Sequence, residues 1–356
     1  MKFWLQRALL VLVGLFLIAK LTPAAVYDRN GNQITDAGGA INWELLSAAK
    51  GKNYNGIGVV SPENNSGWIC TAFLLNSLPT SDKTKAPSQS TKTLSIEPSP
   101  AYALTNGHCS NTFSFPGVDE LIIKQPSDLF VVLNWFFDVE PEQRLQIPIK
   151  KVLYTTTTGT DIAILELDTT YQQLVASGFQ PLTIDPNPPT VGESVELIGA
   201  PDVSDYYLHR AVCKTGKSVN LREGSQRWTG SIRHRCSAIS GMSGSPLISL
   251  RTHRVVAIHN TSIKPKALSQ PECSDERPCE VLADGKTVTV LSENYAQRVS
   301  DIPACFDEKG IFNLQLSKCR LNYGRGRAYQ VVIITLVTID FVARVLLKNN
   351  RVKKIN

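Results

Sequence analysis

Glycine and proline interrupt this 356-residue chain too often for long helices. It contains 23 glycines and 20 prolines, and its apolar residues gather in short runs rich in valine, isoleucine and threonine. Such runs favour β-strands that are bounded by turns. The sequence therefore predicts a mostly β protein, and its length allows two substantial cores.

The eight cysteines form an even set, and none of their spacings with nearby histidines matches a zinc-binding pattern. We therefore predict disulfides, an oxidising compartment, and neither a metal nor another cofactor. The net charge is +6, and the positive residues form no long basic run outside the C-terminal tail. Nucleic-acid binding is accordingly not expected.

Both ends of the chain carry apolar segments. Lys2 and Arg7 precede the apolar run 8–19, and small residues follow up to residue 25, which is the layout of a secretory signal or of an uncleaved anchor. Residues 329–347 are long enough to span a membrane, although two charges within them would be costly in lipid. We expect a secreted or periplasmic protein. The tail either associates with a membrane or packs on the rest of the chain.

Three short motifs carry candidate chemistry. In chain order, His108 lies in Thr-Asn-Gly-His-Cys, Asp161 begins Asp-Ile-Ala-Ile-Leu, and Ser243 lies in Gly-Met-Ser-Gly-Ser-Pro. Taken alone, the third motif fits a hairpin turn as well as it fits an exposed nucleophile. A serine hydroxyl needs a neighbouring base, and an imidazole titrates in the right range. The three residues together therefore form a candidate catalytic set.

Other histidines compete with His108 for the role of base. His209, His234 and His253 lie close to arginines in polar surroundings, and we interpret them as surface residues. His108 is therefore the candidate base.

The three motifs in this order resemble those of the trypsin/chymotrypsin-like serine peptidases, in particular the bacterial trypsin-like and glutamyl-endopeptidase-like branch. The resemblance covers roughly residues 55–303. It implies that His108 acts as general base and then acid, that Asp161 orients and stabilises the imidazolium, and that Ser243 attacks the substrate. It also implies an oxyanion hole formed by the amides of Gly241 and Ser243, and a polypeptide substrate.

The resemblance implies an all-β fold of two packed six-stranded antiparallel β-barrels with a C-terminal helix and a C-terminal extension. The expected divisions of the chain are a signal peptide or anchor at 1–25, a propeptide or N-terminal arm at 26–54, a first barrel at 55–185, a second barrel with its closing helix at 186–303, and an extension with an apolar tail at 304–356.

Local patterns refine this outline. We expect a short helix over residues 43–50, the last barrel strand over 287–291, and the closing helix over 292–302, where Ser292 is a suitable N-cap. The Ser/Thr/Pro-rich segment between residues 75 and 101 is expected to be an exposed loop.

The disulfide framework is expected to have four bonds. In the resembling family the cysteine after the catalytic histidine bonds an upstream strand, and the counterpart here joins Cys70 to Cys109; two buried free thiols are the alternative. The remaining six pair as neighbours along the chain, namely Cys213 with Cys236, Cys273 with Cys279, and Cys305 with Cys319.

Substrate preference is inferred from positions near the nucleophile. Ser237 replaces the acidic residue of trypsin-type pockets, which argues against a preference for lysine or arginine there. His259 matches the pocket histidine of glutamate-preferring relatives, whereas Ala238 lacks the hydroxyl that often accompanies it. The pocket therefore suits either glutamate or a small or apolar residue. The adjoining wall, which pairs with the substrate backbone, consists of Asn260, Thr261 and Ser262.

The sequence thus predicts an exported serine endopeptidase that works through an acyl-enzyme intermediate. The alternative is a catalytically silent relative that serves as a binding or adhesion protein. A membrane-anchored quality-control protease of the periplasm would need an appended peptide-binding domain, and no stretch of adequate length follows residue 320.

Overall fold

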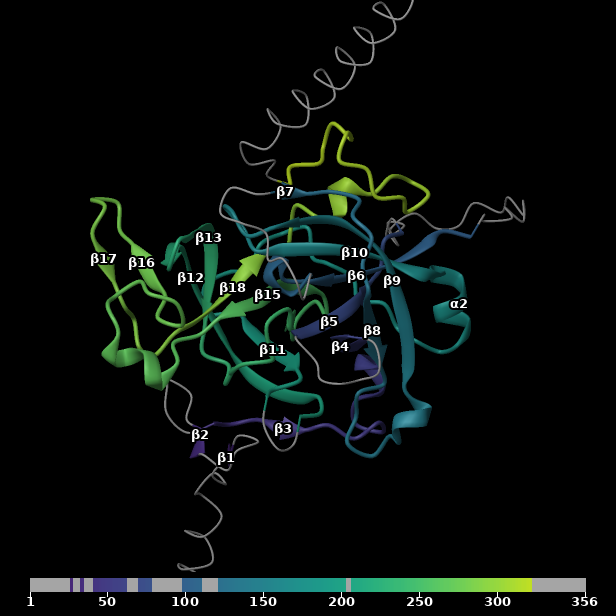
Figure 1. The fold of residues 1–356 in the computed structure, drawn as a ribbon, viewed down its shortest axis with the longest axis horizontal. Helices are drawn as coiled ribbons and strands as arrows, with labels where there is room; N and C mark the ends of the chain where they lie inside the picture. Colours follow the sequence, from purple (N-terminus) through teal and green to yellow (C-terminus); the bar gives the residue numbers. More distant parts are fainter. Residues whose placement is uncertain are drawn as a thin grey trace, which may run out of the picture.

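The computed structural model describes residues 26–27, 33–34, 41–62, 70–78, 98–110, 121–202 and 206–321 (Figure 1). The expected signal segment, most of the 75–101 loop and the apolar tail at 329–347 lie outside the described residues. No helix in the described part is both long and apolar enough to cross a membrane. The fold is all-β and chymotrypsin-like, as predicted.

Six antiparallel strands form the first barrel. They follow the order β10-β6-β5-β4-β8-β9, and β9 pairs with β10 to close the ring. A seventh short strand, β7 (Leu121–Ile122), adds to β9. The six strands are β4 (Ile57–Pro62), β5 (Cys70–Leu75), β6 (Pro100–Thr105), β8 (Leu129–Leu133), β9 (Leu145–Thr156) and β10 (Ile162–Thr170).

Strand β5 explains why these runs contain so few polar residues. All six of its residues are buried. Ala72 and Leu74 belong to one apolar cluster, and Phe73 belongs to another that also contains Ile198 and Ile258 of the second barrel. Because successive side chains of a strand point to opposite faces, one face fills the barrel and the other seals the two barrels together.

Six further strands form the second barrel. They follow the order β11-β14-β15-β18-β13-β12, and pairing of β11 with β12 closes this ring as well. The strands are β11 (Ser194–Gly199), β12 (His209–Glu223), β13 (Gln226–His234), β14 (Pro246–Ser249), β15 (Val255–Thr261) and β18 (Asn294–Arg298).

The predicted closing helix over 292–302 is wrong, because this segment holds β18. Tyr295 and Ala296 are fully buried, and the strand pairs with both β13 and β15. Two neighbouring strands with unpaired backbone groups outweigh a favourable N-cap. The predicted last strand over 287–291 is instead the short β17 (Thr287–Val288), which pairs with β16 (Cys279–Val281) outside the ring.

The predicted helix over 43–50 is also wrong. Strand β3 (Glu44–Leu45) pairs with β12, and Leu46 is buried in the cluster shared by the barrels. Ahead of it, the amide of Asn42 donates to Oγ of Ser237 at 2.9 Å. Residues 41–54 therefore pack as part of the fold. Strands β1 (Val26–Tyr27) and β2 (Gln33–Ile34) pair with each other.

Helix is scarce. The α-helix α2 (Tyr171–Ala176) begins at a capping box formed by Thr170 and Gln173, whose side chain and backbone groups satisfy one another. Other helical turns in the described chain are the 3-10 segments η1 (Lys52–Tyr54), η3 (Gly107–Cys109), η4 (Pro141–Gln143), η5 (Pro265–Ser269) and η6 (Pro303–Cys305).

Four disulfides join the cysteine pairs that we expected. The bond between Cys305 and Cys319 closes a segment that packs on the first barrel, where Phe312 donates its amide to the hydroxyl of Tyr102 at 3.3 Å. This segment lies above the first barrel in the yellow-green part of the ribbon (Figure 1).

Candidate active site

The turn that carries Ser243 is fixed by two glycines and by the first barrel. Gly241 and Gly244 have φ values of 87° and 84°, a region that favours glycine. A Cβ on Gly244 would lie 2.1 Å from the carbonyl oxygen of Thr71. The amide of Thr71 donates to the carbonyl of Ser243 at 2.8 Å. The candidate nucleophile is therefore held at the junction of the two barrels.

The candidate base and acid come from the first barrel. His108 lies in η3, directly after β6, and Asp161 directly precedes β10. Nδ1 of His108 lies 2.6 Å from Oδ2 of Asp161, and the backbone amide of His108 donates to Oδ1 at 3.0 Å. Asp161 is fully buried, whereas 34 % of the His108 side chain is exposed. This geometry places a proton on Nδ1 and leaves Nε2 free to act as a base.

A buried amide network supports Asp161 from behind. Nδ2 of Asn260 donates to Oδ2 of Asp161 at 2.6 Å, and Nε2 of Gln297 donates to Oδ1 of Asn260 at 3.0 Å. We expected Asn260 only in the substrate wall, and no sequence pattern singled out Gln297. Gln297 lies on β18, so its position near the site depends on the strand that we predicted as a helix.

Opposing influences act on the pKa of His108. Burial lowers it, but the charge and hydrogen bond of Asp161 raise it, and the charge of Glu223 adds to that effect. The net shift is upward from the usual imidazole pKa. The base therefore becomes neutral at a higher pH than a free imidazole does.

The hydroxyl of Ser243 donates to the carbonyl of Asn260 at 3.3 Å, and no hydrogen bond joins Ser243 to His108. The backbone amides of Gly241 and Ser243 have no acceptor among the described residues. The carbonyl of Ser240 accepts from the amide of Asp202, so the N–H of Gly241 in the same trans peptide unit points the other way. Both amides are thus free to bind an oxyanion.

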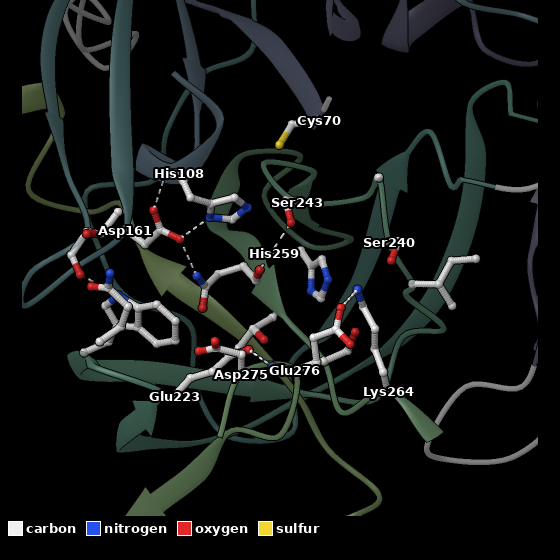
Figure 2. Close-up of a pocket in the computed structure, with 18 residues that line it drawn as sticks. Cys70, His108, Asp161, Glu223, Ser240, Ser243, His259, Lys264, Asp275 and Glu276 are labelled. Carbon is white, nitrogen blue, oxygen red and sulfur yellow. Dashed lines mark hydrogen bonds and ion pairs between the residues drawn. The ribbon is translucent and has the colours of Figure 1, made fainter. Parts of the chain in front are cut away.

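These groups line one cavity of about 700 Å³, which is open to solvent. Figure 2 shows His108 and Ser243 at its upper edge and Glu223, Asp275, Glu276 and Lys264 at its lower edge. The expected substrate residues His259, Asn260, Thr261 and Ser262 also line it.

Two other expected substrate residues do not line the cavity. Ser237 and Ala238 are buried and are not among its lining residues. The hydroxyl of Ser237 instead accepts the hydrogen bond from Asn42 in the N-terminal arm. Met242, next to the nucleophile, is buried in the core of the second barrel.

A second histidine stands directly behind His259. Nε2 of His234 lies 3.0 Å from Nδ1 of His259. Both rings are buried, and burial lowers the pKa of His234 to about 3. Burial, together with the charges of His234 and His108, lowers the pKa of His259 well below its usual value. Both imidazoles are therefore neutral at physiological pH.

The predicted surface positions of His234 and His209 are wrong. His209 is buried, and its ring lies 4.8 Å from that of Trp43 in the N-terminal arm. Each of the two histidines lies on the inward face of its strand. The neighbouring arginines lie on the outward face, and for this reason the sequence interpretation placed the histidines at the surface. His253 is exposed, as predicted.

Two groups of side chains have the spacing of metal ligands, namely Cys70, His108 and Cys109, and Cys213, His234 and Cys236. In both groups the two sulfur atoms form a disulfide. Metals in such sites bind thiolates. Neither group therefore offers a complete ligand set while the disulfides are intact.

The family comparison agrees with this fold. Residues 94–258 match the family model of the trypsin-like peptidase domain. No curated protein sequence matches the chain. Among solved structures, the MamO protease domain from Magnetospirillum magneticum is 13% identical, with 69% of this chain and 93% of that chain covered and a TM-score of 0.40.

Two further solved structures are similar at the same level. The Vibrio cholerae VesB protease is 13% identical, with 73% of this chain and 64% of that chain covered and a TM-score of 0.44. Human heparin binding protein is 13% identical, with 73% of this chain and 92% of that chain covered and a TM-score of 0.42.

Proposed function

The chain has a trypsin-like peptidase domain, and on that premise we propose that it is an exported serine endopeptidase that uses Ser243 as nucleophile. The single observation that carries the proposal is the 2.6 Å contact between His108 and a buried Asp161, in a cavity that also contains Ser243. A buried carboxylate on Nδ1 of a cavity-facing imidazole is the arrangement needed to activate a serine hydroxyl.

The reaction begins when the Ser243 hydroxyl leaves the Asn260 carbonyl and donates to Nε2 of His108. His108 takes the proton as Oγ attacks the substrate carbonyl, and Asp161 stabilises the imidazolium that forms. His108 then gives the proton to the leaving amine, which breaks the peptide bond and leaves an acyl-enzyme. Water, activated by the same imidazole, hydrolyses that ester.

The amides of Gly241 and Ser243 bind the negative oxygen of each tetrahedral intermediate. Because neither amide has another acceptor among the described residues, no protein hydrogen bond must break when the charge develops. Donors that are already oriented in this way stabilise the transition state by several kcal/mol. Removal of one such donor lowers kcat on the order of 10²–10³-fold.

Residues Asn260 to Ser262 are proposed to pair with the substrate backbone as an added strand. The side chain at the cleaved bond then lies beside His259, whose neutral ring can donate one N–H to a carboxylate or pack against a small or apolar group. A peptide library in which only that residue varies decides between glutamate and a small or apolar residue.

Export is the second part of the proposal. The four disulfides are consistent with an extracellular or periplasmic location, because such bonds persist in oxidising compartments. The apolar run near the N-terminus would supply the export signal.

Labelling with a fluorophosphonate probe tests the chemistry directly. Purified, disulfide-bonded protein should become covalently labelled, and Ser243→Ala should abolish the label. Ser245→Ala, two residues along the same turn, is the matched control and should still label. Absence of labelling in folded protein would favour the alternative, a catalytically silent binding or adhesion protein.

A further inference from the structure

One wall of the cavity is rich in carboxylates. It consists of the hairpin end where β12 stops at Glu223 and β13 starts at Gln226, and of the disulfide loop that holds Asp275 and Glu276. The only ammonium group on the cavity lining is that of Lys264, which lies 2.5 Å from a carboxylate oxygen of Glu276. That pair neutralises itself, so among the described lining residues no lysine or arginine remains to balance Glu223 and Asp275.

Glu223 is held in place without a cation. The amide of Glu276 donates to its Oε1 at 2.8 Å, and the side chain of Thr261 also hydrogen-bonds it. Glu223 forms no ion pair with any residue that the structure describes. Burial raises the pKa of Glu223 to about 7 despite these hydrogen bonds. A partly buried carboxylate without a counter-ion gains from any cation that reaches it.

A second acceptor lies on Gln226, the first residue of β13, which pairs with Glu223 across the hairpin. Oε1 of Gln226 is buried, and it accepts no hydrogen bond from any described residue. A buried oxygen of this kind is costly unless a donor occupies the space beside it. Lysine and arginine carry only donors at their charged ends. An anionic and a neutral acceptor at one hairpin end therefore match a lysine or arginine side chain and reject a carboxylate.

The position of Glu223 relative to Ser243 indicates which substrate side chain points toward it. In Figure 2, Glu223 lies below His108 and Asp161, whereas Ser240 lies on the other side of Ser243, beyond His259. Successive side chains of an extended peptide point in opposite directions. When one side chain lies beside His259, the preceding one points toward His108, Thr261 and Glu223.

We propose that Glu223 and Gln226 form a second specificity site, which binds a lysine or arginine of the substrate directly before the residue at the cleaved bond. The inference rests on the proposed peptidase function. It is independent of the residue preferred beside His259, where we expect no basic side chain.

Three peptides that differ at this one position test the site. They carry lysine, norleucine or glutamate there, with the residue at the cleaved bond fixed as the library selects it. The value of kcat/KM for the lysine peptide should exceed that for norleucine by about tenfold, and the glutamate peptide should be the slowest. Norleucine retains the length of lysine without its charge, so the comparison isolates the ammonium group.

Variants test whether Glu223 and Gln226 cause the preference for lysine. Glu223→Gln, which keeps an oxygen for Thr261 and Glu276, should bring the lysine-to-norleucine ratio close to one. The ratio is the readout because it cancels any general effect on activity. Asp284→Asn removes an exposed carboxylate that does not line the cavity and should leave the ratio unchanged. If Glu223→Gln does not fold, Gln226→Glu provides the opposite test and should raise the ratio.

The outcomes separate this inference from the proposed function. Cleavage of all three peptides at equal rates, or a lysine preference that survives Glu223→Gln and does not respond to Gln226→Glu, would overturn the second site and leave the peptidase intact. If no peptide is cleaved and the fluorophosphonate probe does not react, the peptidase proposal fails. The site is then measured by binding of the same peptides to Ser243→Ala, where equal affinities for lysine and norleucine would overturn it.

Discussion

Two buried polar clusters lie next to the cavity, and they differ in charge: one holds a buried anion, and the other holds two neutral rings. The carboxylate of Asp161 accepts hydrogen bonds from the ring and the amide of His108 and from the side chain of Asn260. His234 and His259 contact each other, and burial lowers the pKa of both. Three donors make a buried anion tolerable, whereas two imidazoles without a carboxylate stay neutral. In the proposed mechanism the first cluster stabilises an imidazolium, and the second contributes a neutral wall.

Removing the charge from the first cluster should have the largest effect. Asp161→Asn keeps the shape but no longer stabilises the imidazolium, and kcat for a reference peptide should fall by about 10⁴-fold, as expected when the aspartate of a Ser-His-Asp triad becomes an amide. Asp168→Asn alters an exposed aspartate on β10, the strand that Asp161 directly precedes, and should leave kcat unchanged. A loss of less than about tenfold would show that Asp161 is not part of the mechanism.

Acid should destabilise the folded protein through the second cluster. The unfolded chain binds protons on histidine near the usual pKa of 6.5, but folded His234 does so only near 3. Stability is therefore fully present above pH 6.5 and falls as the pH drops toward 3, by roughly 4 kcal/mol for this residue. Urea unfolding of wild type and His234→Gln at pH 7.5, 5.5 and 4 measures the difference.

His234→Gln should flatten that pH dependence while His253→Gln, at an exposed histidine, should not. Parallel curves for wild type and His234→Gln would contradict the assignment of a buried neutral ring.

The amide network behind Asp161 should contribute a smaller amount. Gln297→Leu deprives the Asn260 oxygen of the donor at 3.0 Å, and an unsatisfied buried acceptor costs about 1–3 kcal/mol. We expect a loss of that size in the free energy of unfolding, measured with urea. Gln315→Leu, on the exposed C-terminal segment, serves as control. An unchanged unfolding free energy would mean that Asn260 finds another donor.

The smallest expected effect is on the pH profile. His108 must be neutral to act as base, and its pKa is raised above the usual 6.5. Activity, measured as kcat/KM from pH 5 to 9, should therefore rise through a midpoint above 6.5. A midpoint below 6.5 would indicate that burial outweighs Asp161.

The two clusters also differ in how far the sequence predicted them. Asp161 and His108 lie in short motifs that carry the family resemblance, and that resemblance implies their roles before any contact is known. The pairing of His234 with His259 could not be read in the same way, because each residue lies on a different strand and only closure of the second barrel brings them together. Nearby arginines made His234 look exposed, although its own side chain faces inward.

The wrong helices have a similar cause. Residues 292–302 and 43–50 carry acceptable helix signals, but both segments pair with strands far away in the chain. Backbone donors and acceptors at the edges of those strands need partners. Local propensity amounts to a fraction of a kcal/mol per residue and does not compete with such pairing.

The sequence by itself determined the β class and the order of His108, Asp161 and Ser243, because glycine turns, apolar runs and short motifs are local properties of the chain. The pairing of Cys70 with Cys109 was inferred from the family resemblance, and the other three cysteine pairs were expected between neighbours along the chain. Only the tertiary structure decided the supporting groups. Gln297 on β18 supports Asn260, His234 on β13 contacts His259, and Glu223 at the end of β12 lines the cavity. Their roles depend on distance and burial, which arise when two closed barrels bring together residues that no local pattern connects.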